Sequence, residues 1–185
     1  EEQAKAAGYE VVTALSIMDD KAHYYPDASS FITKVIADRN THKLLGIQVL
    51  GSGAVDKMVD IAVMGINMGA VLEDFENADF AYAPPFSTAI HPLVQSVCVL
   101  LNKINGVIET MTPAEYAAGK AKDYRILDTA PQPTVRGAQY IDLTQVNGEL
   151  EGIGKDEKLL LVCAKGKRGY FLQNRLRHFG YTNTL

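Results

Sequence analysis

Residues 159–180 read LLLVCAKGKRGYFLQNRLRHFG, and this stretch decides how the second half of the chain is expected to fold. The apolar run 159–162 is short and bounded, as a buried strand would be. After Cys163 comes a loop rich in glycine and cations. Apolar side chains then recur at helical spacing up to Gly180, which stands where a helix C-cap belongs. The predicted order is strand, cysteine, cationic loop and helix.

This order favours a reactive Cys163. A thiol becomes nucleophilic when it ionises, and ionisation is favoured at a helix N-terminus and beside cations. The N–H groups of a glycine-bearing loop also form an anion site there. We predict an anion cradle made of Ala164, Lys165, Gly166, Lys167 and Gly169, with Arg168 beside Cys163 as a second candidate catalytic residue. The alternative is a structural cysteine, buried at a strand end beside a solvated basic loop.

Composition excludes several classes of protein. The 185 residues are 47% apolar and carry a formal charge of −4, which is typical of a soluble globular protein and not of a nucleic-acid-binding one. No apolar run approaches the roughly 20 residues of a membrane helix. Two cysteines are too few for a disulfide framework, so a reducing, cytoplasmic setting is expected. The four histidines show no metal-ligand spacing, and no metal is expected.

The first half has the pattern of a mixed sheet-and-helix domain. Strands are predicted over 9–18, 31–37 and 44–50, and helices over about 55–70 and 92–103. Gly65 and Gly69 would let another backbone approach the first helix, and we interpret them as helix packing, with ligand contact as the alternative. Cys98 lies in the apolar second helix and is interpreted as a core residue.

The second half alternates strands and helices. Thr112, Pro113 and Glu115 have the spacing of a capped helix start, and short strands are predicted over 124–128 and 137–143. Such alternation predicts a small α/β domain with a mostly parallel sheet. We therefore expect two domains, 1–108 and 109–185. The first eight residues read like the tail of a helix, which suggests a fragment of a longer chain.

The segment from Cys163 to Arg168, CAKGKR, resembles the active-site loop of rhodanese domains, C-x-x-G-x-R. The resemblance implies that Cys163 carries a persulfide whose terminal sulfur lies among the loop N–H groups. The six-residue loop is the length that goes with sulfur transfer. Three departures stand against the pattern. Asp128-Thr129-Ala130 replaces Asp-Val-Arg, the segment up to Gly137 is short, and the chain stops before the usual final strand.

The first half resembles the dimerisation domain of pyridine nucleotide-disulfide oxidoreductases, in the branch of coenzyme A-disulfide reductases and NADH oxidases. The resemblance rests on LGIQVLG at 45–51, Asp-Ile-Ala at 60–62 and above all YAPPFS at 82–87. It implies an α+β domain with an antiparallel sheet, followed by the small α/β rhodanese-like domain. It also implies a homodimer.

In that family two tyrosines of this domain reach the partner subunit's active site. The resemblance assigns these roles to Tyr82 and to Tyr24 or Tyr25, and places Pro85 and Phe86 near the partner's flavin site. A phenol there could donate a proton to a leaving sulfur, although packing at an interface is the alternative. His91-Pro92 is similar to a dipeptide of glutathione-reductase relatives, but its different frame favours helix capping or interface packing.

Taken together, the resemblances imply the C-terminal fragment of an FAD-dependent NAD(P)H oxidoreductase acting on coenzyme A disulfide, persulfide or polysulfide. The FAD and NAD(P)H domains would lie upstream of Glu1. Because no G-x-G-x-x-G fingerprint occurs in the chain, no cofactor is expected in the fragment itself. The alternative function is a non-catalytic dimerisation and partner-binding module with an inactive rhodanese-like domain.

Overall fold

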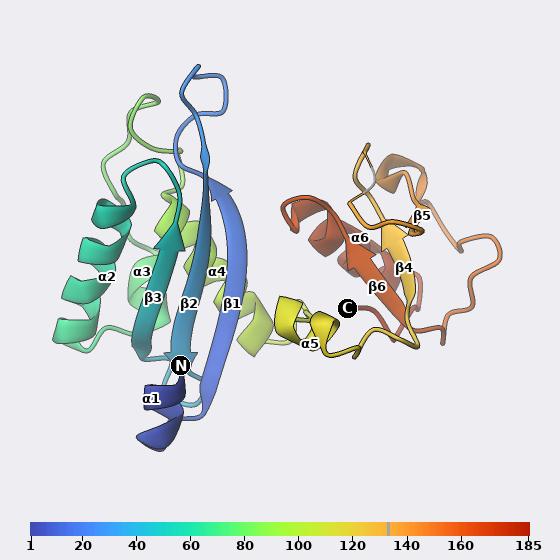
Figure 1. Cartoon of the computed structure of the whole chain (residues 1–185), viewed down its shortest axis with the longest axis horizontal. Helices are drawn as coiled ribbons and strands as arrows, with labels where there is room; N and C mark the ends of the chain where they lie inside the picture. Colours follow the sequence, from blue (N-terminus) through green and yellow to red (C-terminus); the bar gives the residue numbers. More distant parts are fainter. Residues whose placement is uncertain (133) are drawn as a thin grey trace. The chain divides into compact units, whose positions relative to one another are not determined.

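The computed structural model describes residues 1–132 and 134–185, which form two compact units, 1–105 and 106–185. Each unit has its own sheet (Figure 1). Each also has its own hydrophobic core. None of the helices in the described part of the chain is long and apolar enough to cross a membrane.

Unit 1 is built on an antiparallel sheet of order β1-β2-β3, which follows the short helix α1 (Glu2–Ala6). Its strands are β1 (Val11–Asp19), β2 (Ser30–Asp38) and β3 (Leu44–Leu50). The central strand β2 sets the register, because Val35 lies opposite Ala14 of β1 and Ile47 of β3. The three predicted strands are confirmed, with ends that differ by at most two residues.

The helices α2 (Val55–Met68) and α4 (Pro92–Ile104) contact β3 and β1 respectively, and the short α3 (Leu72–Glu76) packs on α4. In β2 every second residue faces these helices, as the period of a strand requires. The residues of this core are Val12, Ala14, Phe31, Val35, Ala37, Leu44, Met58, Ala62, Leu72, Phe75, Leu93, Val97, Leu100 and Leu101.

The two glycines of α2 have different roles. A Cβ built on Gly65 would lie 2.2 Å from Cζ of Phe75, so the Phe75 ring packs directly on this position. The packing interpretation is confirmed for Gly65. It is wrong for Gly69, which is the C-cap of α2 with φ of 71°, a left-handed conformation that favours glycine.

We expect Gly65→Ala to lower the free energy of unfolding of unit 1 by about 1–3 kcal/mol, because the buried Phe75 ring must move to make room. Gly69→Ala is the matched control on the same helix. Its new methyl group would meet nothing within 4 Å, so only backbone strain is added, at about 1 kcal/mol. Urea denaturation followed by amide exchange in α2 measures both, and an equal loss in both variants would contradict the assignment.

Unit 2 contains a parallel sheet of order β5-β4-β6. Its elements are α5 (Pro113–Ala117), β4 (Arg125–Asp128), β5 (Gln139–Tyr140), the 3₁₀ turn η1 (Leu143–Gln145), β6 (Leu159–Val162) and α6 (Lys167–His178). The predicted parallel sheet is confirmed, and so is the capping box of Thr112 and Glu115. The strand predicted over 137–143 is reduced to two residues, and η1 begins at its last predicted residue.

The last three residues lie along the free edge of β6 and form one isolated bridge with it. Leu159 N–H donates to Asn183 O at 2.8 Å, and Leu185 N–H donates to Leu159 O at 2.9 Å, which places 183–185 parallel to β6. No strand follows α6 in the described part of the chain, so the last residues form only an isolated bridge at the position where a further strand would pair. The buried amide of Gln173 fixes this edge, since its Nε2 donates to Thr184 O at 2.9 Å and to Glu109 O at 3.0 Å.

Candidate functional site

Cys163 lies directly after β6, at the carboxyl end of the strand, and is half-buried. The residues that follow it, 164–168, are exposed, and α6 begins at Lys167 with Gly166 as its N-cap. Gly166 has φ of 81°, a conformation that a side chain would strain, which explains the glycine in this loop. The structure thus brings Cys163 to the N-terminal end of α6, as the sequence predicts.

The start of α6 offers free backbone donors. The first helical hydrogen bond is that of Tyr170 N–H to Gly166 O, at 2.9 Å, so the amides of Lys167, Arg168 and Gly169 come before it. A Cβ on Gly169 would lie 3.4 Å from Leu161 O, and the first turn of the helix therefore packs closely on β6. The positive end of the helix dipole adds to the attraction for an anion at this point.

Arg168 makes a contact that the sequence does not reveal. Its guanidinium donates from Nη1 to Thr129 O at 3.2 Å, in the loop that follows β4. Thr129 N–H in turn donates to Val162 O at 3.0 Å, next to Cys163. Arg168 therefore ties the loop after β4 to the loop after β6, and its hydrogen bond goes to Thr129 and not to the Cys163 sulfur.

The buried carboxylate of Asp128 organises the same edge of the sheet. Its Oδ2 accepts from Thr134 N–H at 2.5 Å and from the Thr134 hydroxyl at 2.7 Å, and its Oδ1 accepts from Ala130 N–H at 2.9 Å. Burial favours the neutral acid, but these hydrogen bonds outweigh it and hold the pKa of Asp128 below its usual value. The loop beside Cys163 is thus fixed by an ionised carboxylate.

The candidate tyrosines of unit 1, Tyr24, Tyr25 and Tyr82, lie in two loops, the one between β1 and β2 and the one before α4. Ala22 N–H donates to Pro84 O at 3.3 Å, which joins the β1–β2 loop to the loop before α4 (Figure 1). Tyr24, Tyr82 and Phe86 are exposed at 66%, 49% and 75%, and Tyr25 is half-buried with its ring 5.5 Å from that of Tyr24. We call this exposed surface of Tyr24, Tyr82 and Phe86 the tip. Pro85, which precedes Phe86 in the chain, is half-buried.

His91 is the N-cap of α4, and the capping interpretation is confirmed. Its Nδ1 accepts from Leu93 N–H at 3.3 Å, and its ring centroid lies 4.9 Å from that of Phe80. Burial, and then the positive charge of Lys57, lower the pKa of His91 to about 4. The imidazole is therefore neutral near pH 7.

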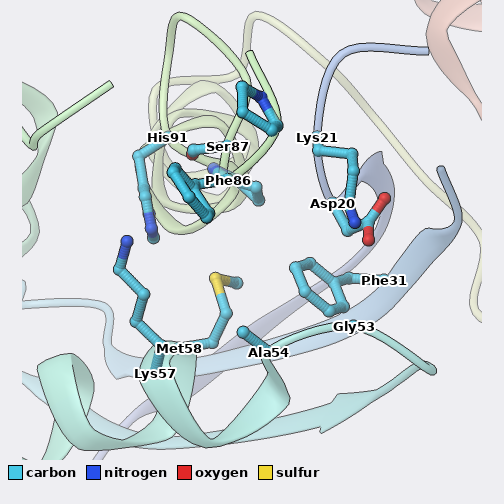
Figure 2. A pocket seen from close by; sticks show the side chains of 12 residues that line it. Asp20, Lys21, Phe31, Gly53, Ala54, Lys57, Met58, Phe86, Ser87 and His91 are labelled. Atoms are coloured by element: carbon cyan, nitrogen blue, oxygen red, sulfur yellow. The ribbon is translucent and has the colours of Figure 1, made fainter. Parts of the chain in front are cut away.

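Behind the tip is a pocket of about 140 Å³ that the sequence analysis missed (Figure 2). Asp20, Lys57 and Ser87 contribute to its wall together with His91. These residues come from separate loops and the start of α2, so no local motif joins them. The one sequence signal is His91-Pro92, which marks a helix start.

Cys98 differs from Cys163 in its surroundings. It is half-buried on α4 rather than inside the core as predicted, and burial and then Glu76 raise the pKa of its thiol. Within residues 1–132 and 134–185, no three His, Cys, Asp or Glu side chains gather as a metal site would require.

Comparison with known proteins places the chain in a family. The dimerisation-domain model of the pyridine nucleotide-disulphide oxidoreductases matches residues 1–94. An NAD(P)H sulfur oxidoreductase (CoA-dependent) of Pyrococcus furiosus is 36% identical over 100 residues, which are 54% of this chain and 22% of that protein.

Two solved structures match the whole chain. They are an NAD-dependent persulfide reductase from A. fulgidus, at 29% identity, and the reduced CoADR-RHD protein of Bacillus anthracis, at 25% identity. Each has a TM-score of 0.89, and the chain covers 34% of each of them. The chain thus spans about a fifth of the curated relative and about a third of these structures. It belongs to the pyridine nucleotide-disulphide oxidoreductase family, and it carries the dimerisation domain of that family.

Proposed function

We propose that this chain is the C-terminal part of a cytoplasmic, homodimeric FAD-dependent NAD(P)H oxidoreductase that acts on coenzyme A disulfide, persulfide or polysulfide. The names of the relatives support the reaction class, since one is a CoA-dependent NAD(P)H sulfur oxidoreductase and another an NAD-dependent persulfide reductase. Residues 109–185 are proposed to be a rhodanese-like domain that carries sulfane sulfur on Cys163.

The observation that carries this proposal is the position of Cys163 between β6 and the N-terminus of α6. In the proposed step the Cys163 thiolate attacks the outer sulfur of a polysulfide or persulfide. The new S–S bond forms on Cys163, the old S–S bond breaks, and the donor leaves as a thiolate. The resulting persulfide anion would be stabilised by the first amides of α6, because these donors have no helical acceptor.

Tyr82 is proposed to act on the partner subunit. Its phenol is exposed at the tip, where it could donate a proton to a sulfur leaving from a disulfide. Tyr24 is proposed for the second position in preference to Tyr25, because Tyr24 is the more exposed of the pair. Pro85 and Phe86 would lie against the partner's flavin.

FAD and NAD(P)H are proposed cofactors of the full protein. No stretch of this chain has the glycine fingerprint that holds a pyrophosphate, so residues outside it would bind both. Bound FAD would supply the electrons from NAD(P)H, whereas this chain would hold sulfur and present the tip tyrosines.

Mass spectrometry of the chain after incubation with polysulfide tests the proposal directly. We expect the peptide that contains Cys163 to gain one sulfur atom, and we expect dithiothreitol to remove it. A chain that gains no sulfur, or gains it elsewhere, would instead support the non-catalytic dimerisation and partner-binding module.

A further inference from the structure

The charged side chains of the pocket behind the tip lie on two opposite sides. Figure 2 shows the nitrogen atoms of Lys57 and His91 close together on one side, whereas Asp20 and Lys21 lie on the other. Lys21 is already paired, since its Nζ lies 2.6 Å from Asp27 Oδ2. Asp20 Oδ1 accepts from Ser29 N–H at 2.7 Å. The side with Lys57 and His91 is therefore the cationic, donor-rich side.

His91 presents a fixed donor there. Because its Nδ1 accepts from Leu93 N–H, the neutral ring carries its proton on Nε2. No hydrogen-bond partner of Nε2 is found among the described residues, and none is found for the ammonium of Lys57. His91 is only 6% exposed as a residue, so most of its ring lies inside the protein beside the pocket.

The hydroxyl of Ser87 is a second, independent observation that points to a ligand. It is 2% exposed, it lines the pocket, and its Oγ has no hydrogen-bond partner in the described part of the chain. A buried hydroxyl without a partner destabilises the fold, which favours a ligand or a bound water at this point. The N-terminus of α2 also faces the pocket through Ala54, whose side chain makes no capping hydrogen bond.

We propose that this pocket binds a small oxyanion, namely the phosphate or carboxylate group of a metabolite-sized ligand. The anion would accept hydrogen bonds from Lys57 Nζ, His91 Nε2 and Ser87 Oγ. The apolar part of the ligand would lie on Phe31 and Met58, and a donor group would face Asp20. This site goes beyond the proposed sulfur chemistry, since it lies in unit 1 and involves no residue of the Cys163 loop.

Phe86 and Ser87 belong to the loop that also carries Tyr82, so a ligand in the pocket would affect the position of Tyr82. The loop is held by turns in which Phe86 and Ser87 N–H donate to Ala83 O, at 2.9 and 3.2 Å. A ligand bound to Ser87 would hold the loop at a second point. Its occupancy would thereby restrict the motion of the tip.

The test is a nuclear magnetic resonance titration of the 185-residue chain with inorganic phosphate and, separately, with acetate. We expect saturable shifts of the His91 ring and of the Ser87 and Lys57 amides. We also expect the protonation midpoint of His91 to rise on saturation, because a nearby anion stabilises the imidazolium. The stronger of the two probes identifies the head group.

Two variants make the test specific. Lys57→Gln is expected to weaken binding about tenfold, as the loss of one charge-assisted hydrogen bond would, and Ser87→Ala is expected to weaken it without unfolding the chain. Lys43→Gln, at another exposed lysine of unit 1, is the matched control and should bind as the parent does. Shifts that do not saturate, or equal binding by the Lys57 and Lys43 variants, would overturn the proposal.

Discussion

Cys163→Ser is expected to abolish the release of thiocyanate when the polysulfide-treated chain is exposed to cyanide. In the parent chain, cyanide attacks the outer sulfur of the Cys163 persulfide, leaves as thiocyanate and restores the Cys163 thiolate. A serine hydroxyl cannot carry this sulfur, so the yield should fall from about one equivalent per chain to background. The serine side chain is nearly isosteric, and the variant should keep the fold of unit 2.

Cys98→Ser is the matched control for this prediction. Burial raises the pKa of the Cys98 thiol, so it stays protonated and reacts slowly near pH 7. The Cys98 variant should therefore release as much thiocyanate as the parent. Equal release from the Cys163 variant and the parent would contradict the assignment of the sulfur to Cys163.

The stability of unit 1 is expected to fall as the pH drops from 6.5 to about 4. The unfolded chain binds a proton at His91 below pH 6.5, whereas the folded chain resists until the lowered pKa of about 4. The contribution is therefore complete above pH 6.5 and is lost as the pH falls toward 4. The full loss amounts to about 3 kcal/mol, since one pKa unit is worth about 1.4 kcal/mol.

His91→Asn isolates this effect. Asparagine is a good N-cap and does not titrate, so α4 keeps its cap while the pH dependence due to the imidazole disappears. Urea midpoints of unit 1 across this pH range should then vary less in the variant than in the parent. His23→Asn, in an exposed loop, controls for the loss of an imidazole. The same slope in the parent and the His91 variant would argue against burial as the cause.

Helices and strands could be predicted from the sequence where their formation depends on neighbouring residues. The Thr112-Pro113-Glu115 spacing predicts a capped helix start, and the Cys163 stretch predicts strand, loop and helix, because each depends on contacts within a few residues. Gly65 and Gly69 show the limit. Both fit one packing pattern, but only the fold places Phe75 over the first and leaves the second as a cap.

The features of the candidate sites likewise fall into those that the local sequence predicts and those that only the tertiary structure shows. The sequence alone determined that a cysteine would be followed by glycine and cations at a helix start, since neighbours along the chain fix that arrangement. Only the tertiary structure decided that Arg168 binds Thr129 and that Lys57, Ser87 and His91 line one pocket. These residues meet because sheet pairing and helix packing bring distant segments together, and no local periodicity encodes which side chains then become neighbours.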